Sequence, residues 1–136
     1  ILLLFLCLVL FRGKIKELLS HQIKESARKK YTEQELQQME EMYDNSEKKY
    51  DFTFLEFGSK GCVACRKMED VMKYFKNNRK DIYVIFYNVN TEEGSKMAEF
   101  YGVVSIPTQV LLDKKGKEFY RHSGYISEKD LEEILK

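Results

Sequence analysis

The sequence predicts one α/β domain built on a mixed sheet of four to five strands with helices on both faces. Hydrophobic periodicity supports this prediction, because short apolar runs alternate with amphipathic helical stretches after residue 45. Strands joined by a helix are expected to be parallel neighbours, whereas a short turn joins an antiparallel pair. A length of 136 residues with 43% hydrophobic content is enough for one domain with a substantial core.

The first eleven residues are uncharged and apolar. They cover about half of the ~20 residues that a membrane-crossing helix needs. Because the chain begins with Ile1 and no small-residue cleavage site follows Phe11, we interpret residues 1–11 as the end of a trimmed signal-anchor, with a cleaved signal sequence as the alternative. Cys7 is expected to act there as one more small hydrophobic residue.

Charge is distributed unevenly along the chain. Residues 12–31 carry a net charge of +5 and the remaining residues −4, although the formal total is +1. A basic stalk beside an apolar head predicts a membrane-facing end, and the near-zero total argues against nucleic-acid binding. We therefore expect a monomer that is extracytoplasmic (periplasmic or at the cell surface) and membrane-tethered or secreted. Basic residues directly after a membrane segment also favour the cytoplasmic side, so the cytoplasmic face stays open.

Helical spacing continues from Lys14 to about Lys49. Apolar residues recur there at steps of three and four, first in the stalk and then after Thr32. Thr32 followed by Glu35 is typical of a capping box, which begins a second helix. This second helix is expected to dock on the domain that spans residues 32–136.

The elements of the domain follow from local signals. An apolar run predicts the first strand, which ends at the turn residues 58–61. Asn90 or Thr91 is suited to cap one helix and Ser127 another, and Gly102 is suited to end the first of them. The predicted order is strand 51–57, helix 62–76, strand 82–89, helix 91–101, strand 108–112, turn 113–116, strand 117–121 and helix 128–135.

Cys62 and Cys65 lie where a predicted strand ends and a helix begins. Residues i and i+3 of a first helical turn face each other closely enough for a disulfide. Cys62 lies at the helix N-terminus, where free amides and the positive end of the helix dipole stabilise a thiolate. Basic side chains at Lys60, Arg66 and Lys67 add to this effect. Because Cys65 lies one turn further in, the pair predicts one attacking and one resolving thiol.

Two alternatives for the cysteine pair remain. Zinc needs three or four ligands, and the other candidates are scattered over the apolar head (Cys7), the stalk (His21) and a predicted strand (His122), so we expect no metal site and no cofactor. A purely structural disulfide would close a very small loop and stabilise the fold little.

Glu56 interrupts an apolar strand six residues before Cys62. Its neighbours Phe54 and Phe57 predict burial, which favours the protonated form of a carboxyl group. Such a group near the inner thiol could accept the proton of Cys65 as that residue attacks a mixed disulfide. The alternative places Glu56 on the solvent face of the strand.

Pro107 is the only proline and opens a predicted strand. A cis Ile106–Pro107 bond would give a tight turn and present the backbone of Ile106 to a bound chain. From the residue alone, a trans proline at the first strand position is the commoner state.

These residues together resemble the thioredoxin-like superfamily over residues 33–136. The resemblance rests on the order strand, turn, CxxC and helix, on Ile106-Pro107-Thr108 after the third helix, and on Gly124 before the last helix. Cys62-Val-Ala-Cys65 followed by Arg-Lys-Met-Glu69 is similar to the C-terminal thioredoxin domain of DsbD-type membrane disulfide reductases. Gly61 replaces the usual aromatic residue, and Glu56 replaces the usual buried Asp.

The resemblance implies a redox-active Cys62–Cys65 disulfide with Cys62 as nucleophile and Cys65 as resolving thiol. Glu56 would take the buried-acid position and Pro107 that of a cis-proline facing the dithiol. The residues implied to edge the groove for a partner's cysteine are Val63, Ala64, Ile106, Pro107 and Gly124.

We therefore expect a thiol-disulfide oxidoreductase with a role in cell redox homeostasis. It would reduce disulfides of partner proteins through a mixed disulfide, and a dithiol protein would supply its electrons. A disulfide oxidase or isomerase is one alternative. A redox-inactive thioredoxin-like module that binds polypeptides is the other.

Overall fold

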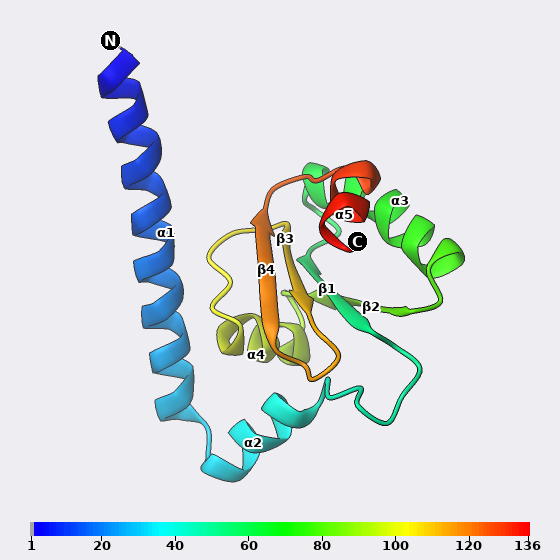
Figure 1. Cartoon of the computed structure of the whole chain (residues 1–136). Helices are drawn as coiled ribbons and strands as arrows, with labels where there is room; N and C mark the ends of the chain where they lie inside the picture. The colour runs from blue at the N-terminus through cyan, green and yellow to red at the C-terminus, as the bar shows by residue number, and fades with distance from the viewer. Residues whose placement is uncertain (1) are drawn as a thin grey trace.

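The computed structural model describes the backbone of residues 2–136 and the side chains of Val9 and residues 11–136. A four-stranded mixed sheet forms the centre of the domain, with helices on both faces (Figure 1). The elements in chain order are α1 (Leu2–Lys30), α2 (Glu33–Glu41), β1 (Phe52–Gly58), α3 (Val63–Asn78), β2 (Ile82–Asn88), α4 (Glu92–Phe100), β3 (Thr108–Leu112), β4 (Glu118–Ser123) and α5 (Glu128–Ile134). The predicted fold class is confirmed.

The strands lie in the order β2-β1-β3-β4. β1 and β2 are parallel, as expected for strands joined by α3, and the short turn makes β3 and β4 antiparallel. The expectation that β2 and β3 are parallel neighbours is wrong, because β3 pairs with β1 and runs antiparallel to it. Residues 101–107 carry the chain from α4 back to the end of the sheet where β1 terminates, so β3 begins beside the end of β1 and not beside its start (Figure 1).

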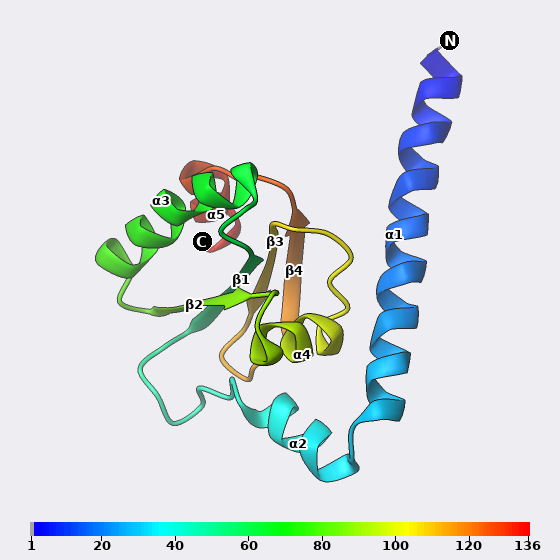
Figure 2. The same ribbon diagram turned by 180° about the vertical axis from the view of Figure 1, so that it is seen from behind.

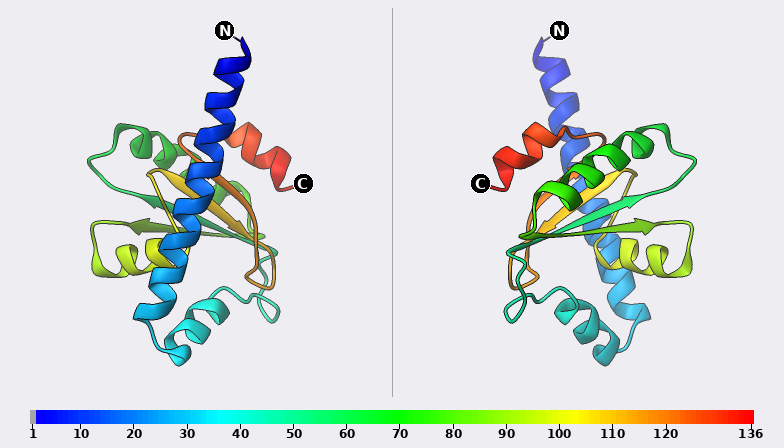
Figure 3. Two further views of the ribbon diagram at one scale, coloured as in Figure 1. Left: turned by 90° about the vertical axis from the view of Figure 1, so that its left-hand side faces the viewer. Right: turned by 90° about the vertical axis from the view of Figure 1, so that its right-hand side faces the viewer.

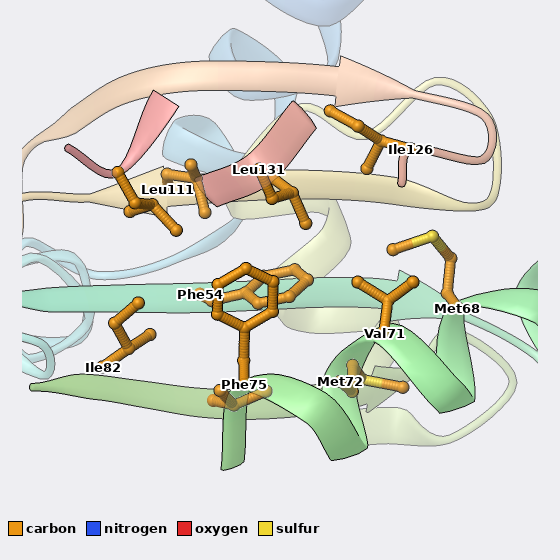
Figure 4. Close-up of a cluster of buried hydrophobic side chains, with 11 residues drawn as sticks. Phe54, Met68, Val71, Met72, Phe75, Ile82, Leu111, Ile126 and Leu131 are labelled. Carbon is orange, nitrogen blue, oxygen red and sulfur yellow. The ribbon is translucent and has the colours of Figure 1, made fainter. Parts of the chain in front are cut away.

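Two apolar cores fill the two sides of the sheet, because successive strand residues point to opposite faces. On one side, Phe54 and Leu111 lie in the core with α3 and α5, and the rings of Phe54 and Phe75 meet edge to face at 5.8 Å (Figure 4). On the other side, Leu55 and Val110 lie in a core with α2 and α4. The end of β1 is therefore held rigidly between two packed layers.

Helix α1 runs without a break through the apolar head and the basic stalk, and its C-terminal half lies beside α4 (Figures 2 and 3). Ala27 is buried in this contact region, and Lys30 Nζ lies 2.9 Å from a carboxylate oxygen of Glu99 on α4. The predicted stalk is thus docked on the domain. Among the described residues, no helix combines the length and apolar character that a membrane crossing requires.

Helix α2 begins at the predicted capping box but ends at Glu41, well before Lys49. Asn45 explains the early end. Its backbone N–H donates to the carbonyl of Lys114 at 2.7 Å, and its side chain donates to Thr53 Oγ1 at 2.9 Å. These bonds fix the chain to the sheet and to the β3–β4 turn, so the helix cannot continue.

Candidate active site

A Cys62–Cys65 disulfide lies at the N-terminus of α3, with a Cα–Cα distance of 5.2 Å that is normal for such a bond. Cys62 is the N-cap residue, and its sulfur accepts a hydrogen bond from the backbone N–H of Cys65 at 3.2 Å. Cys65 is 4% exposed, whereas Cys62 is only half-buried. The outer sulfur is therefore the one that a partner can approach.

The surroundings of the outer sulfur favour a negative charge. The first turn of α3 contains no acidic residue. Arg66 Nη1 donates to the backbone carbonyl of Lys60 at 3.4 Å, which brings two basic residues to the turn before the helix. Together with the unpaired amides of the helix N-terminus, these groups lower the free energy of a thiolate at Cys62.

Val63 and Ala64 lie in the first turn of α3, between the two cysteines. Val63 is 64% exposed and Ala64 is half-buried. An apolar side chain that is so exposed beside the outer sulfur offers a contact for a partner.

Glu56 is fully buried in the middle of β1, as its apolar neighbours predicted. Burial raises the pKa of its carboxyl group to about 8, against a smaller lowering effect from the hydrogen bond that Gln109 donates. Gln109 Nε2 lies 3.0 Å from Glu56 Oε2. The other carboxyl oxygen, Oε1, has no hydrogen-bond partner among the described residues. The carboxyl group is therefore protonated at neutral pH.

Glu56 shares a sheet face with Gly58, two residues further along β1. A Cβ atom placed on Gly58 would lie 3.3 Å from both Cβ and Sγ of Cys65. The side chain of Glu56 therefore points to the face of the sheet that carries the inner sulfur. Alternate strand residues are about 7 Å apart, so Glu56 lies about that far along β1 from the position next to Cys65.

The Ile106–Pro107 peptide bond is cis. The carbonyl of Pro107 accepts a hydrogen bond from the backbone N–H of Gly124 at 2.8 Å, which joins the two segments expected to edge the groove. Gly124 has a φ of 101°, a conformation that favours glycine. Thr108 pairs with Phe57 at the end of β1, so this loop lies at the end of the sheet from which the CxxC turn departs.

A pocket of about 260 Å³ opens beside the inner sulfur. It is lined by Ser59, Lys60, Cys65, Glu69, Met72 and Phe86. Phe86 pairs in register with Glu56, and its ring would lie 3.1 Å from a Cβ atom on Gly58. The pocket therefore gives solvent an approach to the inner side of the disulfide.

Sequence reasoning missed Gln109 and Phe86. Gln109 carried a signal, because it is a polar residue inside an apolar strand just as Glu56 is. Phe86 carried none, since its position beside Glu56 depends on the strand register. His122 lies on β4, where its Nε2 is 3.1 Å from the carbonyl of Tyr125.

The thioredoxin-like domain family matches residues 36–136. Curated relatives include the thiol-disulfide oxidoreductases ResA of Bacillus thuringiensis subsp. konkukian and Bacillus cereus, each 27% identical over 105 residues. The aligned part is 61% of this chain, and the chain spans 61% of the length of these relatives.

Solved thioredoxin structures share the fold. A mutant thioredoxin of Halobacterium salinarum superposes with a TM-score of 0.59 at 23% identity, covering 70% of this chain and 78% of that one. Thioredoxin-2 of the malaria parasite gives 0.56 at 29% identity, with 62% and 81% covered. The thioredoxin of Fasciola hepatica gives 0.57 at 26%, with 66% and 83% covered. The match over residues 36–136, together with the cysteine pair at the start of α3, means that this chain belongs to the thioredoxin-like domain family.

Proposed function

We propose that this chain is a thiol-disulfide oxidoreductase that reduces disulfides of partner proteins. The observation that carries the proposal is the disulfide at the N-terminus of α3, with a half-buried outer sulfur and a buried inner one. The ResA relatives, which are described as thiol-disulfide oxidoreductases, support it.

In the reduced protein, the Cys62 thiolate attacks one sulfur of a partner's disulfide in line with the S–S bond. That bond breaks, a Cys62–partner mixed disulfide forms, and the departing partner sulfur takes up a proton from water. Cys65 then loses its proton and attacks the Cys62 sulfur. The second partner sulfur leaves as a thiolate, so the partner gains two electrons and the Cys62–Cys65 disulfide forms again.

Glu56 serves as the local store for the proton of Cys65. In the oxidised state the carboxyl group is protonated, because its pKa is about 8. When a donor dithiol reduces the disulfide, Cys65 leaves as a thiolate and takes the proton of Glu56. The carboxylate that results is the base for the resolving attack, and the proton returns to Glu56 as the disulfide closes.

The cis-proline loop supplies the other wall of the reactive site. Ile106 is half-buried and precedes Pro107, so its backbone can pair with an extended segment of the partner beside Cys62. Gly124 has open space beyond its Cα, which leaves room for that segment. A second dithiol protein would return electrons to the Cys62–Cys65 pair.

The experiment that decides between a reductant and an oxidase or isomerase is the equilibrium reduction potential of the pair against glutathione. A value near about −270 mV, the thioredoxin range, is expected. A value near about −120 mV would overturn the proposed direction. If a Cys62→Ser variant kept full partner function, the redox-inactive binding module would be the correct function instead.

We also propose that residues 1–11 and the basic stalk hold the domain at the extracytoplasmic surface of a membrane. The uncharged apolar run followed by a net charge of +5 supports this location. Expression of the full chain followed by alkaline extraction of membranes and external protease treatment tests it. A chain that is released by alkali, or that is protected from external protease in intact cells, would contradict the proposal.

A further inference from the structure

Helix α1 carries an apolar stripe that the domain covers only in part. Ile15, Leu19, Ile23 and Ala27 recur at intervals of four residues and so share one side of the helix. Ala27 is 2% exposed where α1 meets α4, whereas Leu19 is 41% and Ile15 38% exposed. The stripe thus leaves the domain surface toward the N-terminal half of α1.

The uncovered part of the stripe forms one wall of a groove. The groove holds about 560 Å³ and is lined by Arg12, Gly13, Ile15, Lys16, Leu19 and Val104. Val104, which forms the opposite wall, is 37% exposed and belongs to the loop between α4 and β3. An apolar floor between a helix and a loop is a suitable site for apolar side chains of another polypeptide.

The two walls are fixed to each other. Gly102, at the start of the loop, approaches α1 so closely that a Cβ atom there would lie 2.6 Å from the carbonyl oxygen of Ser20. Lys24 of α1 lies 3.7 Å from Glu118 on β4, and Glu118 in turn binds Arg121. Arg121 Nη1 donates to the carbonyl of Gly102 at 3.3 Å. The groove is therefore a preformed feature of the fold.

The groove shares a loop with the proposed reactive site, because Val104 and the cis Ile106–Pro107 bond both lie between α4 and β3. Val104 precedes Ile106 by two residues, which is at most about 7 Å of extended chain. The N-terminal half of α1 runs past the end of the sheet at which β3 begins, beside the loop that carries the cis peptide bond (Figures 1 and 2). A partner segment that lies along Ile106 would reach the α1 groove within a few residues.

The rim of the groove is basic. Arg12 and Lys16 line it, and neither forms a salt bridge within the described part of the chain. Residues 12–31 carry a net charge of +5, whereas the rest of the chain carries −4, so an acidic partner segment would be attracted to α1. Charge complementarity thus selects acidic flanks.

We propose that the groove between the N-terminal half of α1 and Val104 binds an acidic stretch of polypeptide with apolar residues, located next to the disulfide that Cys62 attacks. This inference rests on the proposed function and adds a substrate class to it. A lipid surface or a second copy of the chain is a different occupant, and the experiment below separates both from a polypeptide.

The test uses the pre-reduced full chain and two peptides with one disulfide each. The peptides share apolar residues beside the disulfide, and their flanks are acidic in one and basic in the other. The wild-type chain is expected to reduce the acidic peptide faster. In the double variant Arg12→Glu/Lys16→Glu, the rate for the acidic peptide should fall about tenfold, since two exposed charge pairs are reversed. The rate with dithiodipyridine, a small neutral disulfide, should stay unchanged.

The matched control is Lys14→Glu/Lys29→Glu, which makes the same charge change on α1 outside the groove. A second variant, Ile15→Ser, should slow both peptides about equally. The proposed binding site would be overturned if the two double variants lost the same fraction of the rate for the acidic peptide. It would also be overturned if the wild-type chain reduced the two peptides at equal rates. The proposal would also be overturned if the Arg12→Glu/Lys16→Glu variant changed only the binding of the chain to anionic lipid vesicles, or only its dimer formation, and left both peptide rates unchanged. A wild-type chain that fails even with dithiodipyridine would overturn the proposed function, and this inference with it.

Discussion

Replacement of Glu56 by Gln should change how the stability of the oxidised protein depends on pH. Gln has the size of Glu and can still accept the hydrogen bond of Gln109, but it cannot ionise. In the wild-type chain, burial raises the pKa of Glu56 to about 8, whereas an unfolded Glu has a pKa near about 4.3. The unfolded chain therefore releases this proton at a lower pH than the folded chain does.

The sign and size of this pH effect on the free energy of unfolding follow from proton linkage. Below about pH 4.3 both states hold the proton, and Glu56 contributes its full stability. Between about pH 4.3 and pH 8 only the folded state holds it, so the free energy of unfolding falls by about 1.4 kcal/mol per pH unit. The loss is complete above the folded pKa and amounts to about 5 kcal/mol. Glu56→Gln removes this dependence.

The assay is urea unfolding of both oxidised proteins at intervals from pH 4 to 9, followed by circular dichroism. The difference in unfolding free energy should grow in favour of Glu56→Gln as the pH rises from about 4.3 to about 8, and should then stay level. Other titrating groups are common to both proteins and cancel in the difference. Parallel stability curves over this range would refute a protonated, buried Glu56.

Three further predictions concern Glu56 as a base, Gly58 beside the inner sulfur and Gly102 beside α1. Glu56→Gln should prolong the mixed disulfide about 100-fold in stopped-flow traces and leave the first attack unchanged, and equal slowing of both steps would contradict its role as a base. Gly58→Ala should cost about 1 to 2 kcal/mol in urea unfolding, because the added Cβ meets Phe86 at 3.1 Å and the inner sulfur at 3.3 Å. Gly61→Ala, with no atom within 4 Å of the added Cβ, is the matched control and should change stability by less than about 0.5 kcal/mol. Gly102→Ala should speed hydrogen exchange in α1, since the residue has a φ of 63° and its new Cβ would displace the helix; unchanged exchange would argue against a docked α1.

Local signals predicted the elements of this fold better than their pairing. The two cap candidates, Asn90 and Thr91, and the stop at Gly102 predicted the ends of α4 within a residue or two, and the structure places the cap at Thr91. Such signals depend only on nearby backbone groups. The direction of β3 was not predicted, because no local sequence signal indicates to which end of the sheet the loop before Pro107 carries the chain. The end of α2 was missed for a related reason, since Asn45 is held by partners that are distant in sequence.

The candidate site shows the same limit. The burial of Glu56 followed from its apolar neighbours, and the closeness of Cys62 and Cys65 followed from their spacing in the first turn of a helix. Gln109 and Phe86 could be placed beside Glu56 only once the register of β1 against its two neighbouring strands was known. The docking of α1 could not be foreseen either, because ion pairs such as Lys30–Glu99 join residues far apart in the chain.

Burial is what makes Glu56 suitable as the base for a thiol. An ordinary carboxylate, with a pKa about four units below that of a free thiol near 8.5, would take the proton of Cys65 at a cost of about 6 kcal/mol. With its pKa raised to about 8, the carboxyl group of Glu56 comes close to the pKa of an ordinary thiol, which is about 8.5. The proton can then move in either direction, as a cycle of reduction and oxidation requires. The burial of Glu56 therefore has two consequences. It lowers the unfolding free energy of the protein above about pH 4.3, and it lets Glu56 exchange a proton with Cys65.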